Sequence, residues 1–265
     1  MRLLVVNPNI SDDVTTLIRT EAERSAAPTT ELVVRTAPYG VEYIETRFES
    51  LIAAGAVAQV VAEHRDVDGI VVAAFGDPGM PALKELADVP VLGITEAALC
   101  AAALQGQRFS VVAISDRITA WYRECVERFG FGGRLASIRS IKEALRGIGT
   151  VQNDFRAPLV ELARLAVAED GADVVVLAGA PLAGLAREVA GEIPVPVVDG
   201  IGAGIRFAEA LVSLKSGPHR AGSFAVPPRK ARSGLSPELD AMLASAQAAA
   251  GASDGSAATI EGRAQ

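Results

Sequence analysis

Cysteine and histidine are scarce in this sequence of 265 residues, which holds two of each. Cys100 and Cys125 are too few for a disulfide framework, and no spacing of Cys and His resembles a zinc site. Both thiols lie in segments of helical character, where a cysteine usually serves as a small packing residue. We therefore expect no metal site in this protein.

The chain also lacks an excess of positive charge. Its formal net charge is −7, and no basic run or aromatic and basic patch appears, which argues against nucleic acid and anionic membranes as partners. No apolar stretch approaches the roughly 20 residues that cross a membrane, and the apolar run 3–6 is too short for a signal peptide. We expect a cytoplasmic protein whose partner is a small molecule.

What the chain does have is a regular alternation of strand and helix signals. Short apolar, β-branched runs alternate with longer segments of helical periodicity, which is typical of an α/β fold with mostly parallel sheets flanked by helices. The predicted strands are 2–7, 31–37, 68–74, 90–94, 108–114, 134–140, 173–178 and 195–198, and the predicted helices are 11–26, 47–64, 79–87, 95–105, 117–129, 154–169, 182–190, 200–216 and 236–249. Ser11 and Thr95 are predicted to cap the helices that they begin.

Two strand pairs repeat in the same order and at nearly the same spacing. Residues 2–6 resemble 108–112, and residues 68–74 resemble 173–179. A duplicated half predicts two similar lobes with a site in the cleft between them. Ala74 and Gly179, which end equivalent strands, would then face each other across that cleft.

The repeat also divides the chain. Lobe one is predicted to be 1–95 plus about 206–228, and lobe two 96–205. The remaining residues, 229–265, form a C-terminal extension rich in small residues, which we expect to be largely disordered.

Four turns at the carboxyl ends of predicted strands are the places for chemistry, because parallel α/β sheets bind ligands at that edge. They are Asn7-Pro8-Asn9-Ile10-Ser11, Phe75-Gly76-Asp77-Pro78-Gly79, Ile114-Ser115-Asp116-Arg117 and Gly179-Ala180-Pro181-Leu182. Asn9 and Ser11 offer an amide and a hydroxyl to a carboxylate, imide or amide, although the same residues also suit a plain turn with a helix cap. The glycine-rich turns bring backbone N–H groups close to a ligand, so we expect Phe75, Gly76, Ser115 and Ala180 to contact it.

Asp77 is the candidate general base. It is the only carboxylate on these four turns without a basic neighbour. The alternative is that Asp77 caps helix 79–87, with Pro78 at the first helical position. A capping carboxylate has a lowered pKa and is a weak base.

Two further groups of side chains follow predicted strands near the same edge. The first group is Tyr39, Tyr43, Glu45 and Arg47. It either covers a ligand or forms an ordinary surface loop. In the second group, Arg117 precedes Trp121 and Tyr122 on one helix, where it either clamps a carboxylate or lies exposed.

Five of these motifs, taken together and in order, resemble a known family. They are Met1-Arg-Leu-Leu-Val-Val-Asn-Pro-Asn9, Phe75-Gly-Asp-Pro-Gly79, Pro90-Val-Leu-Gly-Ile-Thr-Glu-Ala97, Arg108-Phe-Ser-Val-Val112 and Pro196-Val-Val-Asp-Gly200. Over about 1–225 the chain resembles the hydantoin and allantoin racemase branch of the aspartate/glutamate racemase superfamily. The resemblance implies two lobes related by a pseudo-two-fold axis, a homo-oligomer, no cofactor, and two cysteines that act on opposite faces of the substrate carbon.

The family cysteines map to Ala74 and Gly179, and neither residue can carry a proton. The resemblance therefore implies a racemase or isomerase of a small amino acid, hydantoin or related carboxylate or ureide that uses a non-cysteine base. Asp77 is the first candidate for this base, followed by Glu45, Tyr43 and Glu96. Two alternatives stay open: a decarboxylase of the same superfamily, which needs one proton donor, and a non-catalytic protein that binds a small metabolite.

Overall fold

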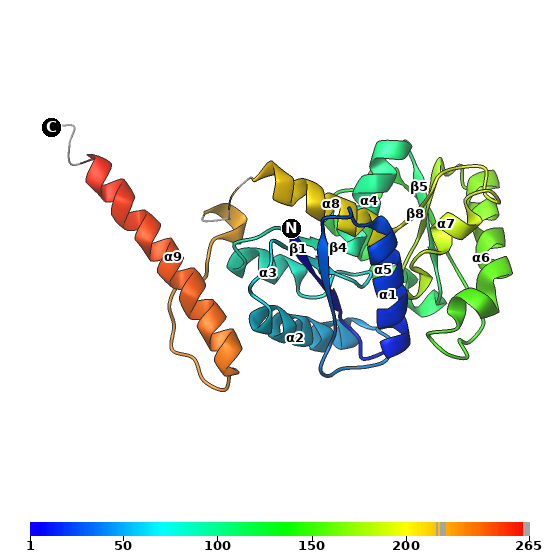
Figure 1. Cartoon of the computed structure of the whole chain (residues 1–265). Helices are drawn as coiled ribbons and strands as arrows, with labels where there is room; N and C mark the ends of the chain where they lie inside the picture. Colours follow the sequence, from blue (N-terminus) through cyan, green and yellow to red (C-terminus); the bar gives the residue numbers. More distant parts are fainter. Residues whose placement is uncertain (216, 218–220, 262–265) are drawn as a thin grey trace.

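The computed structural model describes residues 1–215, 217 and 221–261. They form two four-stranded parallel sheets, with strand orders β2-β1-β3-β4 and β6-β5-β7-β8, and helices flank both sheets (Figure 1). The strands are β1 (Arg2–Asn7), β2 (Glu31–Thr36), β3 (Gly69–Val72), β4 (Val91–Gly93), β5 (Phe109–Ala113), β6 (Leu135–Ser140), β7 (Val174–Leu177) and β8 (Val197–Asp199). The helices are α1 (Asp12–Ser25), α2 (Arg47–Glu63), α3 (Met80–Leu86), α4 (Ile94–Gln105), α5 (Thr119–Arg128), α6 (Val151–Ala168), α7 (Leu185–Val189), α8 (Gly200–Leu214) and α9 (Pro237–Glu261). The predicted fold class is confirmed.

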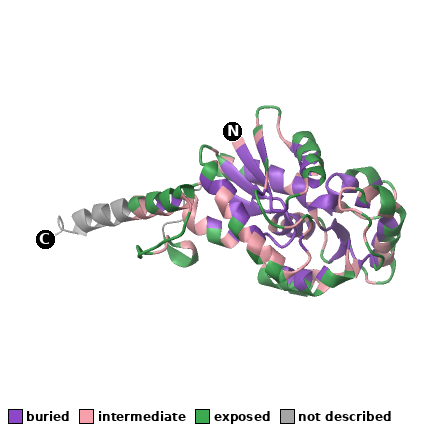
Figure 2. Cartoon of the chain, turned by 90° about the horizontal axis from the view of Figure 1, so that it is seen from below, coloured by how far each residue is buried: buried purple, intermediate pink, exposed green. Residues whose placement is uncertain are grey.

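The central strands are mostly apolar because helices cover both faces of each sheet. All four residues of β3 and of β7 are buried, as are all five of β5. Figure 2 shows the same arrangement, with buried strands inside and the exposed residues on the outer sides of the helices. Each sheet therefore has a hydrophobic core on both of its faces.

The duplication extends to individual hydrogen bonds. In the first lobe Asp68 Oδ2 accepts from the backbone N–H of Arg2 at 2.7 Å, and in the second Asp173 Oδ2 accepts from that of Arg108 at 2.9 Å. In each case the aspartate precedes the third strand of its lobe and holds the start of the first. Equivalent residues thus fix the same strand pair in both lobes.

Two helices tie the lobes together. Apolar residues of α8 pack against the first sheet; these are Ile201, Ile205 and Ala208, in a cluster with Leu3, Val5 and Val71. Apolar residues of α4 pack against the second sheet; these are Ala98, Leu99 and Ala102, in a cluster with Val111 and Val176. Each sheet is therefore covered in part by the helix that follows the last strand of the other.

The predicted helix caps fare differently. Ser11 Oγ accepts from the N–H of Val14 at 3.3 Å and caps α1, as predicted. The prediction for Thr95 is wrong, because α4 begins at Ile94 directly after β4, and its N-cap is Gly93. With no turn between strand and helix, Thr95 lies inside the first turn and its side chain is used elsewhere.

The C-terminal extension begins with an irregular segment and ends in α9, which projects from the body (Figure 1). Met242 and Ala246 of α9 are buried. Met242 packs in one apolar cluster with Val60 and Val61 of α2, and Ala246 lines a pocket together with Val61. The helix continues to Glu261, beyond the predicted end at 249, in a stretch rich in alanine, the best helix former. Residues 216, 218–220 and 262–265 lie outside the described part, and the disorder expected for the extension stays a prediction. Within the described part, no helix has the length and apolar character needed to cross a membrane.

Candidate functional site

The parallel strands bring the predicted turns to one edge of each sheet. Beside the end of β1, the N–H of Ala73 donates to the carbonyl of Val6 at 2.8 Å, and the N–H of Ala37 donates to that of Asn7 at 2.9 Å. The turn 7–11 therefore lies between the loop 74–79 and the segment that follows β2. This is the arrangement that the sequence predicts for the first lobe.

The turn 7–11 is rigid because its side chains bond to one another. Asn9 Oδ1 accepts from Asn7 Nδ2 and from the N–H of Ser11, both at 2.9 Å. Asn7 Nδ2 also donates to Thr15 Oγ1 at 2.9 Å. Asn9 is 4% exposed, and its Nδ2 donates to none of the described residues by any recorded bond. Ser11 Oγ accepts in the cap and keeps its own O–H, so Asn9 Nδ2 and the Ser11 hydroxyl are the donors of this turn that remain for a ligand.

The loop 75–79 is shaped by three residues in the left-handed region. Gly76, Asp77 and Gly79 have φ of 108°, 51° and 78°. A Cβ on Gly76 would lie 2.3 Å from the ring of Trp121, which comes from α5 of the other lobe. Glycine at 76 thus permits the two lobes to approach each other at this point.

The side chain of Asp77 caps α4, the helix predicted at 95–105, and this capping was not predicted from the sequence. Its carboxylate accepts from the N–H of Thr95 at 2.9 Å and from that of Glu96 at 3.0 Å, at the start of α4. The predicted capping of helix 79–87 by Asp77 is wrong, because α3 begins at Met80 with Gly79 as N-cap and Pro81, not Pro78, in its first turn. Each oxygen of the proposed base already has a backbone partner.

The environment of Asp77 acts on its pKa in two directions. Its side chain is 1% exposed, and burial raises the pKa to about 7, whereas hydrogen bonds from the backbone of Thr95 and Glu96 lower it. A carboxyl with a pKa near 7 is suited to act as a general base at neutral pH. Its hydrogen bonds, however, are those of a structural helix cap. The pKa of Asp77 therefore favours a catalytic role, whereas its position favours a structural one.

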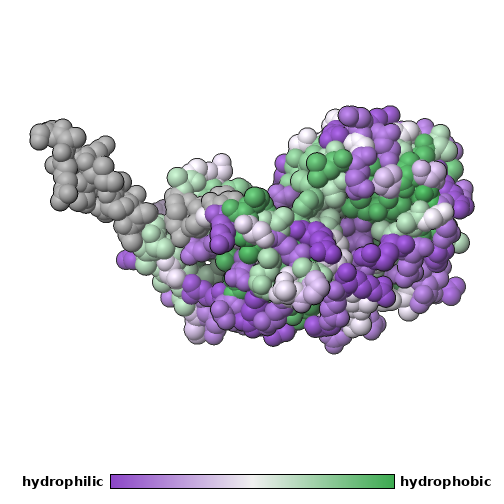
Figure 3. All heavy atoms as spheres, turned by 45° about the horizontal axis from the view of Figure 1, so that its top comes forward, coloured by the Kyte–Doolittle hydropathy of each residue, from purple (hydrophilic) through white to green (hydrophobic). Residues whose placement is uncertain are grey.

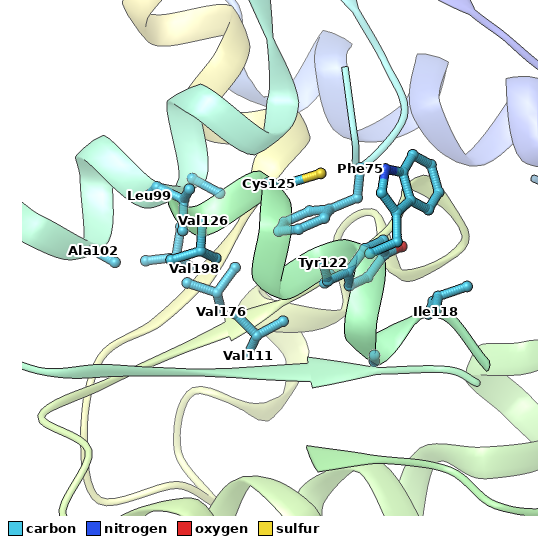
Figure 4. Close-up of a cluster of buried hydrophobic side chains, with 14 of the residues drawn as sticks. Phe75, Leu99, Ala102, Val111, Ile118, Tyr122, Cys125, Val126, Val176 and Val198 are labelled. Carbon is cyan, nitrogen blue, oxygen red and sulfur yellow. The ribbon is translucent and has the colours of Figure 1, made fainter. Parts of the chain in front are cut away.

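Tyr122 lies close to both of the positions predicted to face each other across the cleft, Ala74 and Gly179. Ala74 belongs to one buried cluster with Phe75 and Tyr122, whose rings have centroids 4.4 Å apart. On the other lobe, a Cβ placed on Gly179 would lie 3.8 Å from Tyr122 Oη. Figure 4 shows Phe75 and Tyr122 side by side, with the hydroxyl of Tyr122 directed away from Val126 and Val176 in the apolar interior. Tyr122 thus contacts Phe75, the residue after Ala74, and its hydroxyl lies close to Gly179.

Gly179 differs from a cysteine position in its backbone as well as its side chain. Its φ of 112° and ψ of 144° belong to a region that is nearly exclusive to glycine. Pro181 follows closely, and its Cδ would lie 3.5 Å from a Cβ at 179. A side chain at this position would be strained, at a cost of about 1–3 kcal/mol.

The segment 38–46 crosses from one lobe to the other. The N–H of Ile10 donates to the carbonyl of Val41 at 3.0 Å, which holds the segment to the first lobe. Ile44 packs in the cluster of Tyr122, and Tyr43 packs against the second-lobe cluster that contains Ile141. The segment therefore lies over the junction between the lobes, where a covering loop was predicted.

Tyr43 has a buried hydroxyl without a partner. Among the described residues, Tyr43 Oη is one of two buried side-chain oxygens or nitrogens that make no hydrogen bond, and the other is Glu21 Oε2. Burial raises the pKa of Tyr43 above its ordinary range, and the charges of Glu45 and Glu49 add to the effect. The phenol is neutral and has a proton to donate.

A pocket of about 440 Å³ brings four of the predicted residues together. Its lining includes Tyr43, Glu45, Ser115 and Arg117, together with Lys142 and neighbouring residues of the segment 141–145. Arg117 is exposed, while Ser115 accepts from its N–H at 3.3 Å. The pocket offers a carboxylate, a guanidinium and hydroxyl groups, which suits a small polar ligand with both donors and acceptors.

Other predicted residues lie away from this pocket. Ala180 is 2% exposed and packs among the apolar residues of α1. Glu96 pairs with Lys84 at 2.9 Å, beside an apolar pocket of about 590 Å³ between α4 and α8. Arg47 forms an exposed ion pair with Glu124, and the hydroxyl of Tyr39 would lie 3.0 Å from a Cβ on Gly55 of α2.

The two thiols have different surroundings. Cys125 is buried on α5, and burial raises its pKa to about 11. Cys100 is half-buried and borders the apolar pocket between α4 and α8. Neither thiol lines the pocket of about 440 Å³ that contains Tyr43 and Arg117.

Figure 3 shows apolar side chains gathered on one part of the upper face among polar ones, and the exposed leucines of α4 and α8 include Leu104 and Leu214.

Sequence reasoning named Tyr122 only as a neighbour of Arg117. The helical periodicity of 117–129 places Tyr122 on the inner face of α5, but which lobe its hydroxyl reaches depends on the contact between Trp121 and Gly76.

Within residues 1–215, 217 and 221–261, no three side chains of His, Cys, Asp or Glu gather closely enough to hold a metal ion.

Comparison with known proteins gives consistent matches over most of the chain. The model of the family described as Asp/Glu/Hydantoin racemase matches residues 3–208. The hydantoin racemase of Paenarthrobacter aurescens is 35% identical over 233 residues, which cover 87% of this chain and 99% of that protein.

Two solved structures are similar throughout. The allantoin racemase from Klebsiella pneumoniae has a TM-score of 0.85 and 35% identity, over 90% of this chain and 98% of that one. The allantoin racemase from Pseudomonas fluorescens has a TM-score of 0.83 and 36% identity, over 88% of this chain and 100% of that one.

Proposed function

Because this chain belongs to the Asp/Glu/hydantoin racemase family, we propose that it is a cofactor-independent racemase or isomerase of a small hydantoin, ureide or amino-acid-like carboxylate, with a base that is not cysteine. The observation that supports the proposal is the position of Tyr122 beneath the segment 38–46: its ring centroid lies 4.4 Å from that of Phe75, which follows Ala74, and its Oη would lie 3.8 Å from a Cβ on Gly179. The two positions expected to flank a substrate carbon are thus both close to residues at one junction between the lobes. With no thiol at either position, the proposal requires other proton carriers.

A carboxylate is the natural replacement for the missing base. Asp77 is the candidate from sequence, and its raised pKa of about 7 favours it. Glu45 is the candidate that the pocket favours, because it lines the cavity beside Tyr43. Its charge also contributes to raising the pKa of Tyr122, after burial, which supports this candidate.

The remaining predicted residues suit recognition of a planar amide or a carboxylate. Asn9 presents an amide, Ser115 a hydroxyl, and Arg117 a guanidinium that pairs with a carboxylate or a carbonyl oxygen. Phe75 adds an apolar wall next to Tyr122. This combination supports a small ligand with a flat polar group and an apolar substituent.

The test follows the α-proton of candidate substrates by proton NMR in deuterated water. The panel contains single enantiomers of 5-substituted hydantoins and of allantoin, with aspartate, glutamate and aryl malonates. We expect the unaltered chain to exchange the α-proton of at least one hydantoin or ureide faster than a protein-free sample. Loss of carbon dioxide from an aryl malonate without any such exchange would favour the decarboxylase alternative instead.

The base is identified by comparing Asp77→Asn with Glu45→Gln. Loss of a general base should lower the exchange rate by roughly 100-fold or more. Because Asp77 also caps α4, the urea midpoint of each variant is measured beside its rate. A loss in Glu45→Gln at an unchanged midpoint assigns the base to Glu45, whereas losses in Asp77→Asn count only for folded protein.

The Ala74→Cys variant tests the pocket separately. Ala74 does not have a positive φ, so a thiol there should fold, whereas Gly179→Cys would carry the strain of its positive φ. Exchange by Ala74→Cys alone would show a racemase pocket whose natural chain lacks the chemistry. No exchange by either the unaltered chain or Ala74→Cys would contradict the proposal and favour a binding protein.

A further inference from the structure

We propose that Tyr122 is the proton donor on the Gly179 face of the site. Its hydroxyl protonates the substrate carbon, because residue 179 has no side chain that could do so. This inference rests on the proposed function and adds a named acid to it. A reaction that inverts a carbon centre needs a proton carrier on each face, and the second lobe offers no other carrier at this position.

The position of the hydroxyl is the main argument. Tyr122 Oη would lie 3.8 Å from a Cβ on Gly179, which is within the reach of the side chain that the position lacks. The ring is held by Phe75 at 4.4 Å and by Trp121 at 5.8 Å between centroids, so the hydroxyl is fixed in direction. The Cβ position that glycine leaves empty at 179 therefore lies next to this hydroxyl.

The hydroxyl is also uncommitted. Tyr122 is 3% exposed, and no recorded hydrogen bond joins its Oη to any residue that the structure describes. The neighbouring Tyr43 Oη is fully buried without a partner, whereas Tyr122 Oη is not among the fully buried unpaired atoms and keeps some accessible surface. Buried hydroxyl groups are normally paired, because an unpaired one loses its hydrogen bonds to water. One buried and one accessible phenol, both without a partner at the same junction, favour a ligand atom as their partner.

The surroundings of Tyr122 keep it protonated. Burial raises its pKa well above the ordinary value, and the charges of Tyr43, Cys125, Glu45 and Asp77 act in the same direction. Tyr122 is therefore an acid in the resting site and not a base. The base must lie on the other face, which agrees with a carboxylate from the first lobe or from the segment 38–46.

The proton balance of the reaction follows from these roles. The base removes the α-proton from one face, and the electron pair of the broken C–H bond passes into an enolate of the adjacent carbonyl. A new C–H bond then forms on the opposite face with the proton of Tyr122, and the pair of the broken O–H bond stays on the phenolate oxygen. Water returns a proton to the phenolate and takes one from the base as the product leaves, so no proton is gained or lost overall.

The test separates exchange from inversion in Tyr122→Phe. Each enantiomer of a substrate that the unaltered chain turns over is incubated in deuterated water, with NMR for loss of the α-proton and optical rotation for inversion. We expect inversion to fall by roughly 100-fold or more. The enantiomer whose α-proton faces the base should still exchange it with retention of configuration, whereas the other enantiomer should do neither. A merely structural role of Tyr122 would change exchange and inversion together.

Two variants serve as comparisons. Tyr43→Phe removes the neighbouring unpaired hydroxyl and should alter exchange and inversion by the same factor. Thr20→Ala removes an exposed hydroxyl on the outer part of α1, where it donates to the carbonyl of Thr16, and should leave both rates unchanged. Because the Tyr122 hydroxyl bonds to no described residue, Tyr122→Phe should unfold at the same urea concentration as the unaltered chain.

Three results are decisive. Inversion within about threefold of the unaltered rate in Tyr122→Phe would overturn the inference while leaving the proposed function intact. Equal losses of exchange and inversion would also overturn it, because the tyrosine would then be structural. If the unaltered chain exchanges no α-proton at all, the proposed function and this inference both fail.

Discussion

At the scale of single residues, the position of the Asp77 carboxylate depends on the lack of a side chain at Gly93. A Cβ on Gly93 would lie 1.9 Å from Asp77 Cγ, so only glycine leaves room for the carboxylate that caps α4. We expect Gly93→Ala to destabilise the fold by about 2 kcal/mol or more, since overpacking costs 1–3 kcal/mol and displaces a buried hydrogen-bond acceptor. Urea denaturation measures the loss.

The same pair can be tested by a double-mutant cycle. In the Asp77→Ala background the carboxylate is gone, so adding Gly93→Ala should cost at least about 1 kcal/mol less than in the unaltered chain. Ala→Gly at the exposed position Ala120 of α5 provides a control for a general effect of such changes. Equal costs in both backgrounds would mean that Asp77 and Gly93 do not share this space.

At the scale of elements, the junction of the covering segment with α2 depends on Glu49. Its carboxylate accepts from the N–H of Glu45 at 2.7 Å and from that of Thr46 at 2.9 Å, while Thr46 caps the helix in return. We expect Glu49→Ala to destabilise α2 by about 1 kcal/mol and to loosen the segment 38–46. Kinetics with the turned-over substrate should show a larger rise in KM than fall in kcat.

Thr46→Ala is the matched control for Glu49→Ala. It removes the bond to the N–H of Glu49 but leaves both N–H groups at the end of the segment paired. Its loss of stability should be similar, with a smaller change in KM. A KM in Glu49→Ala equal to that in Thr46→Ala would contradict a covering role for the segment.

Elements were predictable to a greater extent than the contacts between them. The strand 2–7 and the other seven strands follow from local apolar runs, and each lies within two residues of its predicted start. The role of Asp77 was not predictable, because the helix that it caps begins at Ile94, and the missing turn before α4 gives no local signal. The reach of Tyr122 to Gly179 likewise depends on how the lobes meet. Candidate residues on one turn were identifiable, whereas their partners across the junction were not.

At the scale of the whole molecule, buried acids make stability depend on pH. Burial raises the pKa of Asp77 to about 7 and also raises that of Asp199. The folded chain therefore keeps protons that the unfolded chain releases above about pH 4. This contribution to stability is complete below about pH 4 and is lost as the pH rises through about 7.

We predict that the carboxyl carbon of Asp77 titrates near pH 7 in carbon-13 NMR of the folded protein. Exposed acids with lowered pKa, such as Glu124 and Asp240, act on stability in the opposite direction. The denaturation profile is therefore compared between the unaltered chain and Asp77→Ala, whose stability should fall less between about pH 4 and pH 7. Titration of Asp77 below about pH 4 would contradict the account of its burial.

The central claim is that the site of this family still moves a proton without either cysteine. The most direct measurement is the α-proton signal of a single enantiomer of a 5-substituted hydantoin or of allantoin, followed by NMR in deuterated water with the unaltered chain. The account predicts loss of this signal faster than in the protein-free sample, followed by inversion. A rate equal to that of the protein-free sample for every hydantoin and ureide in the panel would contradict it.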